Sequence, residues 1–255
     1  PVSRMDGMKN CQVEVCVESL GSALAAEAGG ADRIELNSAI GLGGLTPTTT
    51  LLHQVRTRIS LPVVCMVRPR AGDFCYSQNE FDLMTSECSA LLEAGAEGIA
   101  IGFLDPGRKI DRPRLEKFKS LCGDRELVFH RAFDCASDPS EAIRVLIDHG
   151  IQRVLTSGGA ATAMRGREQL HSLVNRFGDR IEILPGAGIN SLNVVELVSE
   201  TGCRQVHGTF AKTVESGSTL SEINFNQPLG LESNQMRESC EQEIRKVVQH
   251  LKQLQ

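Results

Sequence analysis

The chain of 255 residues contains no tryptophan and a single tyrosine, Tyr76. Proteins that bind single-stranded nucleic acid stack bases on aromatic side chains, and duplex-binding surfaces carry stripes of lysine and arginine. This chain has few aromatic residues, no such stripe and a formal net charge of −5. We therefore expect no nucleic-acid partner.

Long apolar runs are missing as well. No segment approaches the roughly 18 consecutive apolar residues of a membrane-spanning helix. Residues 1–10 lack the apolar core of a signal peptide, so we expect a cytoplasmic protein with no membrane partner. Residues 1–11 are interpreted as an N-terminal tail, in which Met8 is a candidate natural start and residues 1–7 are a candidate vector-derived extension.

Three common catalytic and cofactor-binding motifs are also absent from the sequence. The nine cysteines include no C-x-x-C pair, which argues against a zinc knuckle or a redox dithiol. Their odd number and scattered spacing predict reduced thiols, most of them packed as small hydrophobes. No lysine falls within an expected strand, which argues against a Schiff-base aldolase. No G-x-G-x-x-G follows the first expected strand, which argues against a dinucleotide-binding fold.

The chain does contain a repeating unit that glycine marks. Each marked glycine follows a stretch with helical spacing and precedes a short aliphatic run, which is typical of a helix ending on a left-handed glycine and leading into a strand. A repeated helix–strand unit predicts a parallel sheet with helical crossovers. The six glycines are Gly30, Gly95, Gly123, Gly150, Gly178 and Gly202.

Eight strands that alternate with helices predict a closed (β/α)8 TIM barrel, formed by residues 12–255 as one domain with a C-terminal helix. A doubly wound open sheet is the alternative. The expected strands are 12–17, 33–37, 62–68, 98–103, 126–131, 153–156, 181–184 and 204–208. The expected helices are 19–28, 47–59, 79–93, 112–121, 139–149, 165–177, 191–201 and 233–254.

Capping residues support several of these helix starts. Thr46 followed by Pro47 is a predicted cap, and so are Asn79, Asp111 and Asp138.

The last helix is inferred from one apolar stripe, which includes Met236, Cys240 and Ile244. The connection 209–232 before it is long, which is typical of a lid, an oligomer contact or a partly disordered segment.

Charged residues gather at the ends of the expected strands, where the active sites of such barrels lie. Carboxylates within strands are costly to bury unless they are paired. Glu14 and Glu35 are therefore expected to face the barrel mouth, with Arg68, Arg70 and Arg131 as candidate counter-charges. A structural ion-pair layer is the alternative interpretation of the same residues.

Histidine supplies the best acid–base candidate, because an unperturbed imidazole titrates near neutrality. His130 at the end of the fifth strand is the first choice, and His207 in the eighth strand is the second. The candidate catalytic residues are Glu14, Glu35, Arg68, His130, Arg131 and Asp134.

Glycine-rich turns follow the last strands. In barrels of this kind the loops after strands 7 and 8 commonly hold phosphate through backbone amides. The candidate anion-binding residues are Ser157, Gly158, Gly186, Gly188 and Gly208.

Several of these segments together resemble one family. The run R-P-R-A-G-D-F-C-Y-S at 68–77 is similar to the signature of the CutC copper homeostasis proteins. Segments 29–36, 43–47, 129–134 and 155–158 match as well, so that the similarity extends from about residue 12 to about residue 210. The resemblance implies a cytoplasmic barrel that forms a homo-oligomer (a dimer or a tetramer), takes part in copper tolerance and binds Cu(I).

The resemblance also implies a metal ligand. Cu(I) prefers thiolate and thioether ligands, and Cys16 matches a cysteine that the family places in the first strand. Several members carry a second cysteine where this chain has Asn37, whose amide cannot replace a thiolate. The other residues that could supply sulfur are Cys65, Met66, Cys75 and Cys135.

Two hypotheses follow. The first is a copper-binding protein without catalysis, with the copper ion as its partner. The second is a barrel enzyme that acts on a small anionic or phosphorylated metabolite, with His130 exchanging a proton and Arg68 or Arg131 holding the anion.

Overall fold

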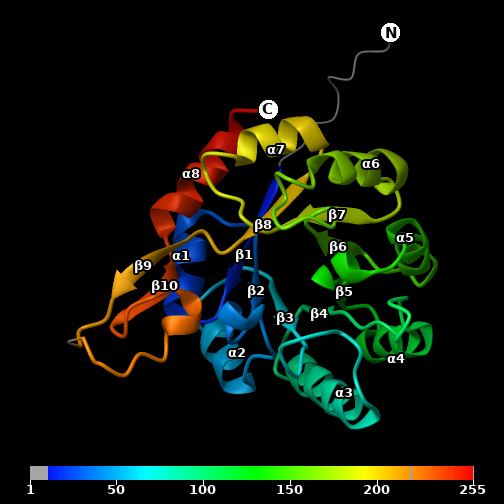
Figure 1. The fold of residues 1–255 in the computed structure, drawn as a ribbon, viewed down its shortest axis with the longest axis horizontal. Coiled ribbons are helices and arrows are strands. Elements are labelled where there is room, and N and C mark those ends of the chain that lie inside the picture. The colour runs from blue at the N-terminus through cyan, green and yellow to red at the C-terminus, as the bar shows by residue number, and fades with distance from the viewer. Residues whose placement is uncertain (1–10, 219, 255) are drawn as a thin grey trace.

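Eight parallel strands run through the centre of the molecule and helices surround them in the computed structural model, which describes residues 11–218 and 220–254 (Figure 1). The predicted N-terminal tail lies outside the described residues except for Cys11. The barrel strands are β1 (Gln12–Val17), β2 (Arg33–Leu36), β3 (Val63–Met66), β4 (Gly98–Ile101), β5 (Glu126–Phe129), β6 (Arg153–Thr156), β7 (Glu182–Pro185) and β8 (Gln205–Gly208).

A helix follows each of the first seven strands. These helices are α1 (Leu20–Gly29), α2 (Thr49–Arg56), α3 (Gln78–Glu93), α4 (Arg112–Cys122), α5 (Pro139–Asp148), α6 (Arg167–Phe177) and α7 (Val194–Thr201), and α8 (Glu241–Lys252) ends the barrel. Short 3-10 turns occupy η1 (Ile40–Leu42), η2 (Arg131–Cys135) and η3 (Gln227–Leu229).

The strands form a nearly closed barrel. Their hydrogen-bonded order is β7-β6-β5-β4-β3-β2-β1-β8, so that β7 and β8 are the two ends of the sheet. These ends lie beside each other, and Gln205 on β8 donates a hydrogen bond of 2.6 Å to Glu182 on β7. The predicted TIM barrel is confirmed, and the open-sheet alternative is wrong.

Two of the predicted helix caps are confirmed. The side chain of Asp111 accepts a hydrogen bond from the backbone of α4, and Asp138 does the same for α5. In both helices a proline follows within the first turn, where its missing N–H has no helical partner to lose.

The other two predicted caps are wrong by two residues. Ser77, not Asn79, caps α3, because it forms a reciprocal capping box with Glu80. Thr48, not Thr46, caps α2. The Thr46 hydroxyl instead bonds to the backbone N–H and carbonyl of Arg68, which lies just beyond the end of β3. Because this contact between distant segments engages the hydroxyl, Thr46 does not cap the helix.

The glycine pattern holds at five of its six positions, where the backbone φ is positive. Gly178 is the exception, because its φ of −60° is right-handed. Beyond it the backbone continues a tight turn, in which Ile181 N donates to Phe177 O at 3.1 Å. This turn explains why the aliphatic run follows this glycine one residue earlier than it follows the others.

The final predicted helix begins too early. Helix α8 starts at Glu241, whereas Met236 lies in strand β10 (Gln235–Ser239), which pairs antiparallel with β9 (Ala211–Glu215). The helical spacing of apolar residues extends N-terminally beyond the start of α8. Strand pairing of Met236 with Val214 nevertheless keeps this segment out of the helix. The segment 209–232 is therefore part of a hairpin arm that projects beside α1 (Figure 1).

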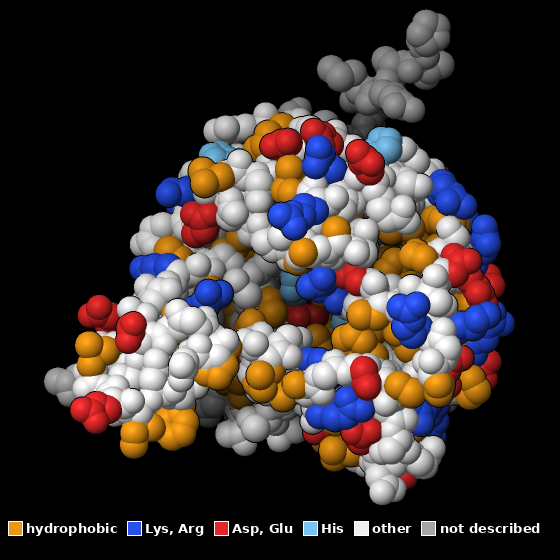
Figure 2. Space-filling model, viewed as in Figure 1, with side chains coloured by type: hydrophobic (Ala, Val, Ile, Leu, Met, Phe, Trp, Pro, Cys, Tyr) orange, Lys and Arg blue, Asp and Glu red, His pale blue; other side chains and the backbone are white. Residues whose placement is uncertain are grey.

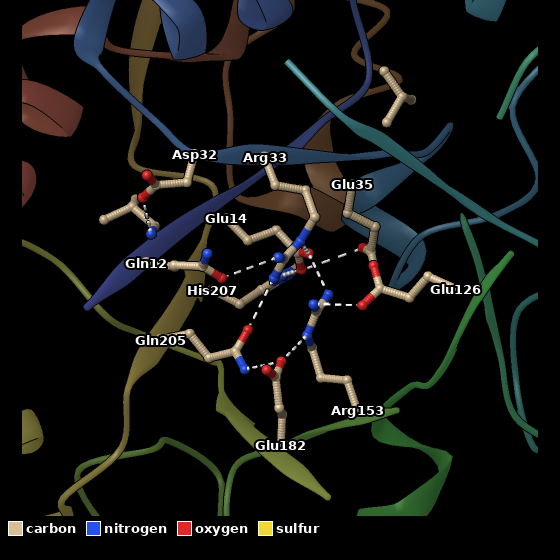
Figure 3. A network of polar contacts seen from close by, with 12 residues as sticks. Gln12, Glu14, Asp32, Arg33, Glu35, Glu126, Arg153, Glu182, Gln205 and His207 are labelled. Carbon is tan, nitrogen blue, oxygen red and sulfur yellow. Dashed lines mark hydrogen bonds and ion pairs between the residues drawn. The ribbon is translucent and has the colours of Figure 1, made fainter. Parts of the chain in front are cut away.

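The interior of the barrel is only partly apolar. A small cluster of Val64, Met66, Ala100 and Val128 fills one side of it. Charged and amide side chains lie inside the barrel as well and pair with one another, and Glu14, Arg33, Arg153, Gln205 and His207 among them are buried (Figure 3). This division places polar chemistry inside the barrel beneath its mouth.

Candidate functional site

An ion network fills the barrel below the mouth and centres on Glu14 (Figure 3). Parallel pairing puts Glu14 of β1 level with Arg33 of β2 and His207 of β8. Its carboxylate bonds to the Arg33 guanidinium, lies 2.7 Å from His207 Nδ1 and lies 3.5 Å from Arg153. These three are its counter-charges, so the prediction of Arg68, Arg70 and Arg131 is wrong for Glu14.

The network continues from Arg153 on β6 to the neighbouring strands. Its guanidinium contacts Glu126 on β5 at 2.5 Å and Glu182 on β7 at 3.1 Å. Arg33 also donates to Gln205 on β8 at 2.9 Å. The interpretation of a structural ion-pair layer therefore describes this part of the barrel.

The ion pairs fix the charge states of this layer. Burial alone would raise the pKa of Glu14, but Arg33, His207 and Arg153 hold that pKa well below its usual range. Burial alone would lower the pKa of His207, but Glu35 and Glu14 raise it above its usual value. Both directions favour the pairing of an imidazolium with a carboxylate.

Above this layer a cavity of about 260 Å³ opens at the carboxyl ends of the strands. Figure 2 shows a hollow at the centre of this face, with histidine and acidic side chains inside it. The predicted residues that line the cavity are Cys16, Glu35, Arg68, His130, Arg131, Gly188, His207 and Gly208. Glu14, Asp134, Ser157, Gly158 and Gly186 are not among its lining residues.

Asp134 instead organises the loop after β6. One of its oxygens accepts a hydrogen bond of 2.5 Å from Thr156 Oγ1 and another of 3.1 Å from Gly159 N. The other oxygen pairs with Arg131 at 2.8 Å and accepts a bond of 3.0 Å from the Ser157 hydroxyl. With both oxygens occupied, Asp134 positions a loop and the Arg131 guanidinium.

Three of the predicted anion donors are already satisfied within the protein. Ser157 N donates to Asp134, Gly158 N donates to Thr156 Oγ1 at 2.9 Å, and Gly186 N donates to the Thr156 carbonyl at 3.0 Å. These amides do not offer the free donors that the glycine-rich pattern predicted. The signal was misleading because tight loops bond to themselves as well as to ligands.

A cysteine, a carboxylate and an imidazole meet on one side of the cavity. Their donor atoms, from Cys16, Glu35 and His207, all lie within 4.8 Å of one another, and all three residues are buried. The Asn37 amide nitrogen donates to Glu35 Oε2 at 2.8 Å and lies 3.3 Å from Cys16 Sγ. The arrangement is a compact group of metal-ligating atoms that one amide holds in place.

Within this group the thiol of Cys16 and the carboxyl of Glu35 favour their neutral forms. Burial, with the charges of Glu35 and Glu14, raises the pKa of the Cys16 thiol well above its usual range. Burial, with the charge of Glu14, also raises the pKa of Glu35. A cation bound here would have to displace the thiol proton.

Arg68 and His130 form the opposite side of the cavity. Arg68 is 4% exposed and donates to the carbonyl oxygens of Leu42, Gly44 and Gly72, each at 3.0 Å. His130 Nδ1 accepts a hydrogen bond of 3.1 Å from Ala132 N, so that Nε2 carries the imidazole proton.

His130 stays neutral over the physiological range. Burial, together with the charges of Arg68 and Arg131, lowers its pKa to about 3. An imidazole held neutral in this way is a hydrogen-bond donor through Nε2, rather than a cation.

Sequence reasoning did not find two of the central charges. Arg33 and Arg153 open their strands, where arginine is usually exposed, yet both are buried. The spacing along the strand could have revealed Arg33, because it lies two residues from Glu35 and therefore on the same face of β2. Of the alternative sulfur ligands, only Met66 lines the cavity; Cys65 is buried outside it, and Cys75 and Cys135 are exposed.

Two general properties accompany this site. All nine cysteines lie within the described residues and are free thiols. Among the described helices, none combines the length and apolar content that crossing a bilayer requires.

The fold and site together define a TIM barrel with a cysteine-containing cavity at its mouth. The family model that describes the CutC family matches residues 11–212, and this chain belongs to that family. A CutC family protein of Treponema denticola is 42% identical over 212 residues, which cover 83% of this chain and 86% of the relative. A CutC family protein of Caulobacter vibrioides is 37% identical over 242 residues, which cover 95% and 97%.

A solved structure agrees with this assignment. The CutC protein of Streptococcus agalactiae, provisionally described as a copper homeostasis protein, superposes with a TM-score of 0.75 at 28% identity. The match covers 78% of this chain and 98% of that protein. The family and the barrel that the sequence predicted are thus both confirmed.

Proposed function

We propose that this chain binds Cu(I) at the barrel mouth, with Cys16 Sγ and His207 Nε2 as ligands, and that it handles copper in the cytoplasm. The observation that supports this proposal is the meeting of Cys16, Glu35 and His207, whose donor atoms lie within 4.8 Å of one another. The free state of all nine thiols is consistent with a reducing compartment.

The second contact of His207 supports its role as a ligand. Its Nδ1 is held 2.7 Å from Glu14, which fixes the orientation of the ring. Metal-binding histidines commonly use a carboxylate in this way to orient the ring and to leave the other nitrogen for the metal. Here Nε2 is left facing the Glu35 side of the cavity, at 4.0 Å from Oε2.

The donor set is poorer in sulfur than Cu(I) prefers. Asn37 occupies the position from which a second thiolate would act, and it donates toward Cys16 Sγ instead. Met66 lines the same cavity and offers a thioether as a further soft donor. We therefore expect weaker binding than a pair of thiolates would give.

Binding should release protons. The thiol of Cys16 must ionise against a raised pKa, and His207 must give up the proton that its raised pKa retains. Because both reactions become easier as pH rises, Cu(I) affinity is expected to increase with pH.

The direct test is an anaerobic Cu(I) titration of the purified protein against a competing chelator. One equivalent should bind tightly to the wild type and not to Cys16→Ala. The control is Cys135→Ala, which removes an exposed thiol outside the cavity. Equal loss of binding in both variants, or none in either, would show that Cu(I) does not bind at Cys16.

A further inference from the structure

The buried guanidinium of Arg68 has no counter-charge within the part of the chain that the structure describes. It forms no ion pair with Asp or Glu there, although it is 4% exposed. Its three hydrogen bonds go to carbonyl oxygens, which satisfy donors but carry no net charge. Burial of a cation is costly unless an anion balances it.

The hydrogen bonds of Arg68 leave part of its donor capacity unused. A guanidinium has five N–H donors. Nη1 uses two of them on Leu42 and Gly44, and Nη2 uses one on Gly72. Nε is buried without an acceptor among the described residues. The donors left over are one on Nε and one on Nη2, a combination that can serve two oxygens of a carboxylate or phosphate.

His130 adds a third donor on the same side of the cavity. Its Nε2 is buried and also has no partner among the described residues, while Nδ1 is occupied by Ala132 N. The imidazole is 3% exposed and packs with Phe74, whose ring also lies under the Arg68 guanidinium. Unsatisfied buried donors are rare in folded proteins, and two of them lining one cavity point to a ligand.

We propose that the mouth cavity binds a small organic oxyanion, a carboxylate or a phosphate monoester, through Arg68 Nε and Nη2 and His130 Nε2. The rest of the ligand would lie against the apolar lining, which includes Met66, Leu155 and Ile189. The cavity of about 260 Å³ limits the ligand to a small metabolite. This site uses neither Cys16 nor copper, so it stands independently of the proposed Cu(I) binding.

The test follows the Arg68 Nε–H resonance by ¹H–¹⁵N NMR in copper-free protein. Inorganic phosphate and acetate are titrated separately at constant ionic strength, with chloride as the reference anion. Arg68→Lys keeps the charge and removes the planar pair of donors. His130→Asn keeps an acceptor for Ala132 N and removes the Nε2 donor. Because Arg68→Lys lacks the Nε–H resonance, its binding is followed on the neighbouring backbone amides.

The expected result is a saturable shift with phosphate, acetate or both, and the responding anion identifies the ligand class. Affinity should fall about tenfold or more in Arg68→Lys and in His130→Asn. Arg70→Met, which removes a cation that pairs with Glu80 outside the cavity, should bind as the wild type does. The proposal is overturned if neither anion shifts the wild-type resonance beyond chloride, or if His130→Asn binds with unchanged affinity.

Discussion

His207 and Glu14 face each other across the paired strands β1 and β8, with Nδ1 of the imidazole 2.7 Å from Oε1 of the carboxylate. The other ring nitrogen lies 4.0 Å from Glu35, which lines the mouth cavity. A single side chain therefore joins the ion layer inside the barrel to the cavity above it.

Removing the charge of Glu14 should destabilise the protein strongly. Glu14→Gln would leave Arg33, Arg153 and His207 without their shared carboxylate, and breaking a buried ion pair in this way costs about 3–5 kcal/mol. Urea unfolding measures the loss. The control Glu241→Gln breaks a surface pair with Arg245 and should cost less than about 1 kcal/mol. A similar small loss in both variants would mean that the layer does not stabilise the fold.

Acid should destabilise the protein through His130. Because the folded-state pKa of His130 is lowered to about 3 from 6.5, its neutral form contributes stability above pH 6.5, which is lost as pH falls toward 3. The contribution reaches about 1.4 kcal/mol per pH unit for one proton. Unfolding free energies measured between pH 7 and pH 4 should therefore fall more steeply in the wild type than in His130→Asn.

The matched control for this pH series is His53→Asn, which removes an exposed imidazole on α2. It should leave the wild-type slope unchanged. Parallel curves for the wild type and His130→Asn would contradict the neutral state assigned to His130.

Restoring a second thiol should tighten Cu(I) binding. Asn37 Nδ2 lies 3.3 Å from Cys16 Sγ, so that Asn37→Cys would place two sulfur atoms on one side of the cavity. Cu(I) prefers thiolates, and the affinity should rise by about tenfold or more in the chelator competition. Ser38→Cys adds a thiol at the next residue, outside the cavity lining, and should have no such effect. Equal gains in both would indicate nonspecific thiol binding.

The packing of α8 on α1 should depend on Gly29. A Cβ atom at this position would lie 2.6 Å from Ile244 Cγ2 and 3.2 Å from the Glu241 carbonyl oxygen. Gly29→Ala should therefore destabilise the protein by about 1–3 kcal/mol through overpacking, as measured by urea unfolding. Gly21→Ala in the same helix meets nothing closer than 3.9 Å and should stabilise it by about 0.5–1 kcal/mol. Loss of stability in both would point to a backbone effect instead.

We also expect the chain to form a dimer or a tetramer through its hairpin arm. Leu220, Ile223 and Phe225 are exposed there, and Phe225 is 90% exposed. Apolar side chains grouped in this way commonly mark a protein interface. Analytical ultracentrifugation should find an oligomer that Phe225→Asp shifts toward the monomer. Leu192, an exposed residue in the turn before α7, provides the control Leu192→Asp, and a monomeric wild type would contradict the prediction.

Part of the fold could be predicted from local sequence. The Asp111 and Asp138 caps and most of the glycine helix ends depend on backbone groups within a few residues, which the sequence places together directly. The end of the chain could not be predicted in this way. There β10 pairs with β9, about 20 residues earlier in the chain, and this distant pairing overrides a helical apolar pattern.

The candidate site likewise has features that the sequence predicts and features that depend on the folded structure. The barrel, the family and the group of polar residues at the strand ends could be predicted from sequence, because the helix–strand repeat and the family motifs are patterns of neighbouring residues. Which charges meet depends instead on how the strands and loops pack against one another. Strand register set Arg33 and His207 against Glu14, and loop bonding engaged Asp134 and the Ser157 amide. Partners of this kind depend on the distance between side chains far apart in the chain, which no local pattern specifies.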